Sequence, residues 1–147
     1  TYTVRRQARE AQRLSDMRRV LNALALFYVD AERFPCQGYG GLPRILVDEG
    51  YLSNIPKDPI DVVPYSYAYS TYKGEVGGLC GQIAHPEFNV EDPSNLAACP
   101  DGKIVGNHCH ILFPHPLPGP PVCPGDPSAY GHGIQDVDGS HCAALAD

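Results

Sequence analysis

The chain has 147 residues, a length that fits a single domain with a hydrophobic core of its own. Its 15 glycines and 15 prolines gather in the second half, which is therefore predicted to consist mainly of loops. The sequence contains no run of 18 apolar residues and begins with neither a methionine nor a signal peptide. The absence of such an apolar run excludes a membrane span in the sequence as given.

Charge is distributed unevenly along the chain. Residues 1–33 carry a net charge of +3 and the remainder −9, which together give −6. A basic segment before an acidic body can face anionic lipid or an acidic neighbouring subunit, although an ordinary solvated helix face has the same composition. Nucleic acid is the less favoured partner, because the acidic body repels phosphate.

The first 31 residues have the periodicity of one long amphipathic helix. Apolar residues recur at steps of three or four and follow one stripe for about eight turns. Such a helix is about 45 Å long, more than a domain of this size needs. We expect residues 17–31 to pack on the body and residues 1–14 to project toward a neighbouring molecule. The predicted assembly stripe consists of Val4, Ala8, Ala11, Leu14, Met17, Leu21, Leu24 and Tyr28.

The end of this helix is predicted at the Phe-Pro corner. Pro35 pushes the residue before it out of the helical region, so the helix has to stop there. Residues 43–52 then predict a second, short helix with Leu46 and Val47 facing inward and Gly50 just past its end.

Three strands are predicted after a proline-rich connector. Residues 65–72 alternate strictly and give the strongest strand pattern. A turn at Lys73-Gly74 is expected to lead into a second strand at residues 75–85, and residues 108–114 form a plausible third. A helix followed by an antiparallel sheet belongs to the α+β class.

The first strand carries a row of tyrosines. Tyr65, Tyr67 and Tyr69 share one face because side chains alternate along a strand. Exposed, they could form a stacking platform for polysaccharide or nucleic acid. The simpler expectation is that this face packs on the helix.

The cysteines point to disulfides. An even number of scattered cysteines in a loop-rich chain is typical of up to three disulfides and an oxidising compartment, whereas six free thiols would indicate the cytosol. No Cys-x-x-Cys pair suggests a zinc ribbon or haem attachment. Fifteen pairings are possible among the six disulfide candidates, and the spacing does not choose between them. These candidates are Cys36, Cys80, Cys99, Cys109, Cys123 and Cys142.

Three segments carry a resemblance to a known family. Residues 8–17 (AREAQRLSDM), 26–35 (LFYVDAERFP) and 52–70 (LSNIPKDPIDVVPYSYAYS) match in order and spacing the stem helix, the helix end and the first strand of type IV pilin-like proteins. The similarity is closest to the major pseudopilins of type II secretion systems. It covers roughly residues 8–72, and Glu32-Arg33 stands where that family often has glycine.

The resemblance implies a fold and a way of acting. It implies one pilin-like domain made with an N-terminal apolar helix half, which anchors in the inner membrane and then packs against its copies in a filament. The chain would then begin after that segment. Its parts are expected to be a stem helix (1–34), a connecting loop (35–64), a sheet (65–113) and disulfide-stapled C-terminal loops (114–147).

Two places could hold a metal ion. Asp136, Asp138 and Ser140 surround a glycine turn with oxygen donors that suit Ca²⁺, and calcium in the C-terminal loop of some pseudopilins favours this interpretation. A plain Asp-Gly turn is the alternative. The cluster of His108, Cys109, His110 and His115 could hold zinc, but only if Cys109 is a thiolate rather than part of a disulfide.

No catalytic motif accompanies these residues, so we expect a structural subunit rather than an enzyme. Its expected partners are copies of itself, related minor pilins and an inner-membrane assembly platform. Its expected location is a periplasmic or extracellular filament. The alternatives are a minor pilin or adhesin that binds a surface ligand, and a secreted metal-dependent enzyme built on the histidines.

Overall fold

The computed structural model describes residues 2–37, 40–76, 79–100 and 103–111. The strands form one antiparallel sheet in the order β1-β2-β4-β3, so the predicted α+β class is confirmed. The elements in chain order are α1 (Tyr2–Ala31), α2 (Ile45–Asp48), β1 (Ala68–Val76), β2 (Leu79–Asn89), the 3-10 turn η1 (Leu96–Ala98), β3 (Lys103–Val105) and β4 (His108–His110).

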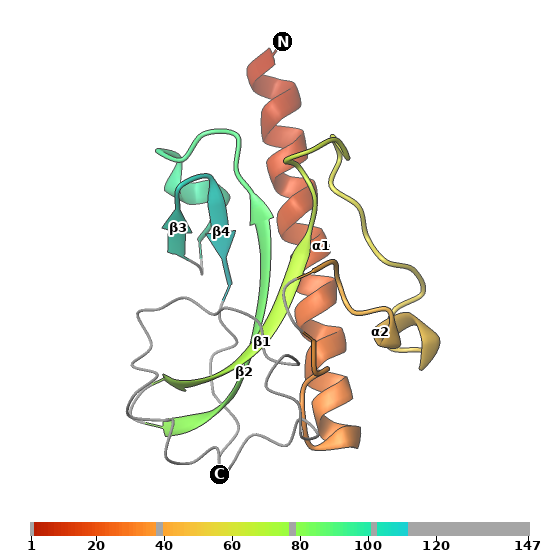
Figure 1. Ribbon diagram of the computed structural model, residues 1–147. Helices are drawn as coiled ribbons and strands as arrows, with labels where there is room; N and C mark the ends of the chain where they lie inside the picture. The colour runs from red at the N-terminus through yellow and green to blue at the C-terminus, as the bar shows by residue number, and fades with distance from the viewer. Residues whose placement is uncertain (1, 38–39, 77–78, 101–102, 112–147) are drawn as a thin grey trace.

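The core lies between α1 and the sheet. Figure 1 shows α1 running along the molecule with the sheet on one side and α2 with the connecting loop on the other. The N-terminal end of α1 extends beyond the strands (Figure 1). Val20, Leu24 and Phe27 of α1 are fully buried, as are Tyr69 of β1 and Phe88 of β2. This apolar layer holds the helix to the sheet.

The predicted stripe is exposed near the N-terminal end of α1 and buried further along the helix. The stripe's steps average about 3.4 residues, fewer than the 3.6 of a helical turn, so the stripe winds around the helix. Its first members Val4, Ala8 and Ala11 are exposed, whereas Met17 and Leu24 are buried. Packing on the body also begins earlier than residue 17, because residues 9–16 already contact it.

Helix α1 ends at Ala31, before the Phe-Pro corner. Glu32 has φ 57°, and its amide donates to the Tyr28 carbonyl at 2.8 Å. This is the left-handed position after a helix that favours glycine. Glu32 therefore takes the conformation for which glycine is suited, at the place where the resembled family often has it. Phe34 and Pro35 follow as buried residues.

The short second helix is confirmed, with Leu46 buried and Val47 half-buried. Gly50 has φ 85° just past its end, as a helix-terminating glycine does.

The strands differ from the prediction mainly at their ends. Lys73 and Gly74 are paired inside β1 rather than forming a turn, and the hairpin closes only after Val76, which pairs with Leu79. Strand β3 was not predicted. Its signal was the Gly106-Asn107 pair between β3 and β4, where Gly106 has the positive φ of 62° that primed hairpin turns need.

The tyrosine face packs against α1, as expected. Tyr67 and Tyr69 are buried, and their hydroxyls donate to Asp16 Oδ2 and to the Pro35 carbonyl, each at 2.7 Å. The alternative of an exposed stacking platform is therefore wrong. The predicted calcium ligands Asp136, Asp138 and Ser140 lie outside the described residues, together with Cys123, Cys142 and His115.

The end of α1 gives a first prediction. Replacing Glu32 with glycine removes the Cβ that disfavours a positive φ, so Glu32→Gly should raise the free energy of unfolding by about 0.5–1 kcal/mol. Glu32→Ala removes the same charge but keeps the Cβ and should give no such gain. Urea denaturation measures both. An equal gain from alanine would attribute the effect to charge and contradict the backbone explanation.

Candidate functional site

The first notable site is a buried arginine in the middle of α1. Arg13 is only 1% exposed. Its Nε and Nη2 donate to the two carboxylate oxygens of Asp58 at 2.8 and 3.2 Å, a bidentate pair. Asp58 also accepts from the amide of Ile60 at 2.8 Å, which fixes the turn of the connecting loop. The guanidinium lies 5.4 Å from the ring centre of Tyr65. Arg13 thus joins α1 to the connecting loop.

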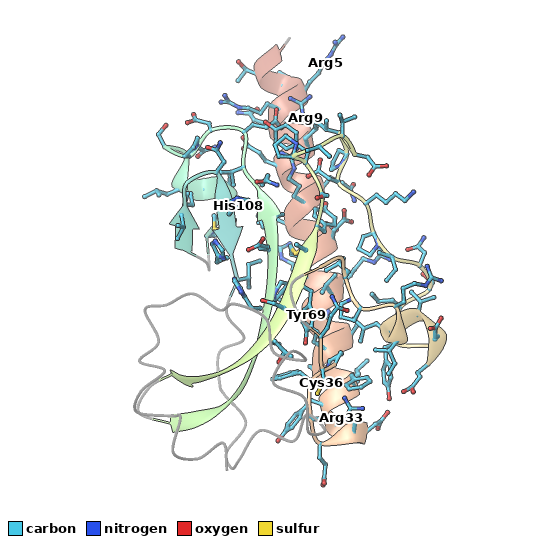
Figure 2. The ribbon with its side chains drawn as sticks, in the orientation of Figure 1. Arg5, Arg9, Arg33, Cys36, Tyr69 and His108 are labelled. Atoms are coloured by element: carbon cyan, nitrogen blue, oxygen red, sulfur yellow. A yellow bond between two sulfur atoms is a disulfide. The ribbon has the colours of Figure 1, made fainter. Side chains whose placement is uncertain are left out.

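Glu91 extends this site beyond the end of β2. It accepts from Arg13 Nη1 at 2.7 Å and from Arg9 Nε and Nη2 at 2.8 and 2.6 Å. One carboxylate therefore binds two arginines that lie one helical turn apart. Figure 2 places Arg9 in the upper half of α1 and Arg5 nearer its N-terminal end.

Asp16 adds a third link from α1, this time to Tyr67, the residue directly before β1. Besides the Tyr67 hydroxyl it accepts a hydrogen bond from Gln12 Nε2 at 2.8 Å. Burial raises the pKa of Tyr67, and so does the hydrogen bond that its hydroxyl donates to the Asp16 carboxylate. We call Arg9, Arg13, Asp16, Asp58 and Glu91 the helix clamp.

Hydrogen bonds within the helix clamp shift the pKa values of Arg13 and Glu91 toward their charged forms. Burial lowers the pKa of Arg13, but the hydrogen bonds to Asp58 and Glu91 raise it by more, so the net shift is upward. The hydrogen bond from Arg9, followed by the one from Arg13, lowers the pKa of Glu91 from 4.5 to about 2. Because the folded pKa is the lower one, Glu91 stabilises the fold above pH 4.5, and this contribution is lost as the pH falls toward 2.

The helix clamp changes the interpretation of the basic stem. Arg9 and Arg13 were expected to belong to a solvated or partner-facing arginine set. They are instead neutralised within the chain by acidic residues of the body. The sequence offered no signal for this pairing, because Arg13 and Asp58 are 45 residues apart. The stem therefore presents less free positive charge than its composition suggests.

The opposite side of α1 is a continuous exposed face. Its members follow steps that average about 3.6 residues, so they form a straight line along the helix. They are all exposed, and only one of them is charged. We call this the solvent face of α1, and it consists of Val4, Ala8, Ala11, Ser15, Arg18, Asn22, Leu26 and Val29.

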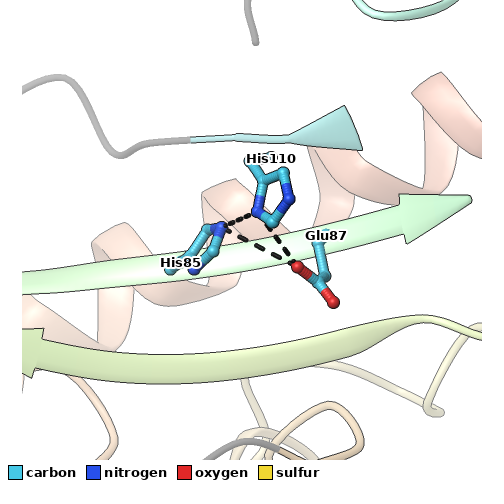
Figure 3. Close-up of side chains that lie close together, drawn as sticks. All are labelled: His85, Glu87 and His110. Atoms are coloured by element: carbon cyan, nitrogen blue, oxygen red, sulfur yellow. Dashed lines mark hydrogen bonds and ion pairs between the residues drawn. The ribbon is translucent and has the colours of Figure 1, made fainter. Parts of the chain in front are cut away.

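A second site lies on the side of the sheet turned away from α1. His85 Nε2, Glu87 Oε2 and His110 Nδ1 converge there (Figure 3). His85 and Glu87 are two residues apart on β2 and so share a face, and Glu87 pairs directly with His110 of β4. The distances are 2.6 Å between the two histidine nitrogens, 3.1 Å from His110 to Glu87 and 3.9 Å from His85 to Glu87.

This cluster is enclosed within the protein. His85 and Glu87 are 3% and 5% exposed, and the His110 side chain is 14% exposed. Burial and the neighbouring His110 lower the pKa of His85 to about 4, although Glu87 opposes the shift. His85 is therefore neutral at pH 7. Its second nitrogen, Nδ1, lies 3.3 Å from the hydroxyl of Ser70, its partner on β1.

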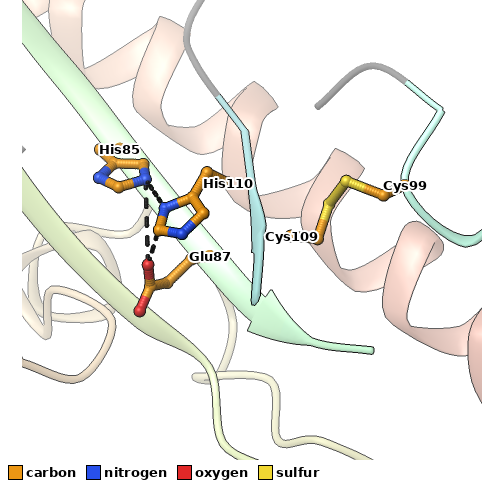
Figure 4. The surroundings of a disulfide bond; sticks show 5 residues. All are labelled: His85, Glu87, Cys99, Cys109 and His110. Atoms are coloured by element: carbon orange, nitrogen blue, oxygen red, sulfur yellow. Dashed lines mark hydrogen bonds and ion pairs between the residues drawn. A yellow bond between two sulfur atoms is a disulfide. The ribbon is translucent and has the colours of Figure 1, made fainter. Parts of the chain in front are cut away.

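A disulfide bond excludes Cys109 as a ligand of the predicted zinc site. Cys109 is bonded to Cys99, so it supplies no thiolate beside the histidines. Figure 4 shows this disulfide and the His85–Glu87–His110 cluster on either side of β4. His110 belongs to the cluster, whereas His108 does not. Cys36 is also disulfide-bonded. His85 and Glu87 were not among the predicted metal ligands, because the predicted strand ended at His85 and the structure extends β2 to Asn89. Their spacing of two was the sequence signal that could have placed them on one face.

Comparisons of the chain with protein-family models, curated proteins and solved structures found no match. None of the helices in the described part of the chain is long and apolar enough to cross a membrane.

The helix clamp gives a second prediction. Arg13→Met leaves Asp58 and Glu91 buried without their shared cation and should lower the free energy of unfolding by about 3–5 kcal/mol. Arg19→Met is the matched control on the same helix. The Arg19 side chain is 43% exposed and lies 3.7 Å from Asp16, so its loss should cost no more than about 1 kcal/mol. Urea denaturation followed by circular dichroism measures both, and equal losses would contradict the clamp.

Proposed function

We propose that this chain is the body of a filament subunit of the type IV pilin-like kind, a pilin or pseudopilin, which acts by polymerising. In this proposal α1 continues a longer stem that carries the apolar half of the helix. Copies of the chain pack helix against helix, and the sheet covers the outside of the filament. The protein has no catalytic role in this scheme.

The solvent face of α1 carries the proposal. Val4, Leu26 and Val29 are 61%, 56% and 72% exposed, although each lies on an element that buries its other side. Ala8, Ala11 and Ser15 are small, so a second helix can approach this face closely. A helix in water normally places charged residues on its outer side, and here Arg18 is the only one among eight. Such a face fits a neighbouring helix better than it fits water.

The helix clamp supports the same proposal. Arg9, Arg13 and Asp16 are three of the charged residues of the first resembled segment, and Asp58 belongs to the Lys-Asp-Pro of the third. Their mutual contacts tie the stem to the body over several turns. A filament needs this rigidity, because force and orientation pass from the helix core to the outer domain through that junction.

The third prediction tests assembly in the organism that makes the protein, using the complete gene. Ala11→Glu places a carboxylate on the solvent face of α1, where it would be buried between neighbouring helices. We expect filaments recovered by shearing to fall at least about tenfold, because an unpaired charge buried at every repeat costs several kcal/mol. Immunoblotting of the sheared fraction and electron microscopy measure the effect.

Ser53→Glu is the control for this experiment. It adds the same charge at an exposed position of the connecting loop, away from α1. It should leave filament yield unchanged, and both purified variants should keep the thermal midpoint of the unmodified domain. Normal filaments from Ala11→Glu, or a native fraction that contains no filaments of this chain, would refute the proposed function.

A further inference from the structure

We infer that His85, Glu87 and His110 bind one Zn²⁺ ion, which fastens the short strand β4 to β2. All three residues belong to the sheet, so zinc binding here does not depend on filament assembly. The site takes a borderline divalent cation through two imidazole nitrogens and one carboxylate oxygen, a donor set suited to zinc.

The geometry of the three donor atoms supports a metal ion. The distances of 2.6, 3.1 and 3.9 Å define a triangle whose centre lies about 2.0 Å from each atom. Bond lengths from zinc to histidine nitrogen and to carboxylate oxygen are about 2.0–2.2 Å. An ion slightly out of the plane of the triangle therefore reaches all three donors without movement of the backbone. Zinc in proteins takes four ligands as a rule, so the ion would bind one further donor besides these three.

The chemistry of the three donor atoms leads to the same inference. Imidazole nitrogens and a carboxylate oxygen can each offer a lone pair toward the common point. A cation at that point attracts all three donor atoms. The hydroxyl of Ser70 lies on the far side of His85, beside Nδ1, and can orient the ring so that Nε2 points toward the common point.

The position of the site explains what the ion would do. Strand β4 pairs with β2 through only three residue pairs. The Cys99–Cys109 disulfide secures the core side of β4, and the cluster lies on its other side. A metal ion there would connect β4 to β2 directly and would add its binding free energy to the stability of the sheet.

The fourth prediction measures this binding on the whole purified chain, which is first freed of metal by chelation and dialysis and then given zinc, with the excess removed. We expect one zinc per chain by elemental analysis, a visible d–d absorption band with Co²⁺ as the probe, and a rise in thermal midpoint on adding zinc. His110→Gln should lower the affinity at least about a hundredfold and abolish both the band and the rise. Glu87→Gln should weaken binding while keeping the shape of the side chain.

His108→Gln is the matched control, two residues away on the same strand and outside the cluster. It should bind zinc within about twofold of the unmodified chain. Circular dichroism confirms that each variant is folded. The inference is overturned if the unmodified chain binds no zinc, if His108→Gln loses as much affinity as His110→Gln, or if bound zinc leaves the thermal midpoint unchanged.

Discussion

The burial of the Arg13 guanidinium is the constraint on which the rest of the structure depends. A buried cation is tolerated only when carboxylates meet it with good geometry, and here they come from the connecting loop and from the residues after β2. These contacts fix where the loop crosses α1 and where the sheet ends. The apolar core of Val20, Leu24 and Phe27 supplies the general attraction between helix and sheet, whereas Arg13 determines their relative position.

Patterns that act locally could be predicted from the sequence. The alternation around Tyr67 and Tyr69 predicted both a strand and the face that packs on the helix, and Gly50 predicted the end of α2. Relations between distant residues could not be predicted. No local rule pairs Arg13 with Asp58, and the union of His85, Glu87 and His110 depends on β2 and β4 being neighbours in the sheet. The two ends of the apolar stripe have different surroundings, because small changes of step accumulate into a rotation around the helix.

The two candidate sites lie on different elements and have different proposed roles. The helix clamp and the solvent face belong to α1, and together they make a helix that is rigidly attached on one side and open to a partner on the other. The histidine cluster belongs to the sheet and concerns how β4 is held to β2. Filament assembly and zinc binding are therefore independent proposals, and either can fail without the other.

The most direct test of the central proposal asks what touches the solvent face of α1 in the assembled state. A photoreactive amino acid placed at Ser15, in the middle of that face, would be activated in cells that produce the complete protein. The account predicts a crosslinked product of two copies of this chain, joined helix to helix by mass spectrometry. Crosslinks that go only to unrelated proteins, or none above the level of the same probe at Ser53, would contradict it.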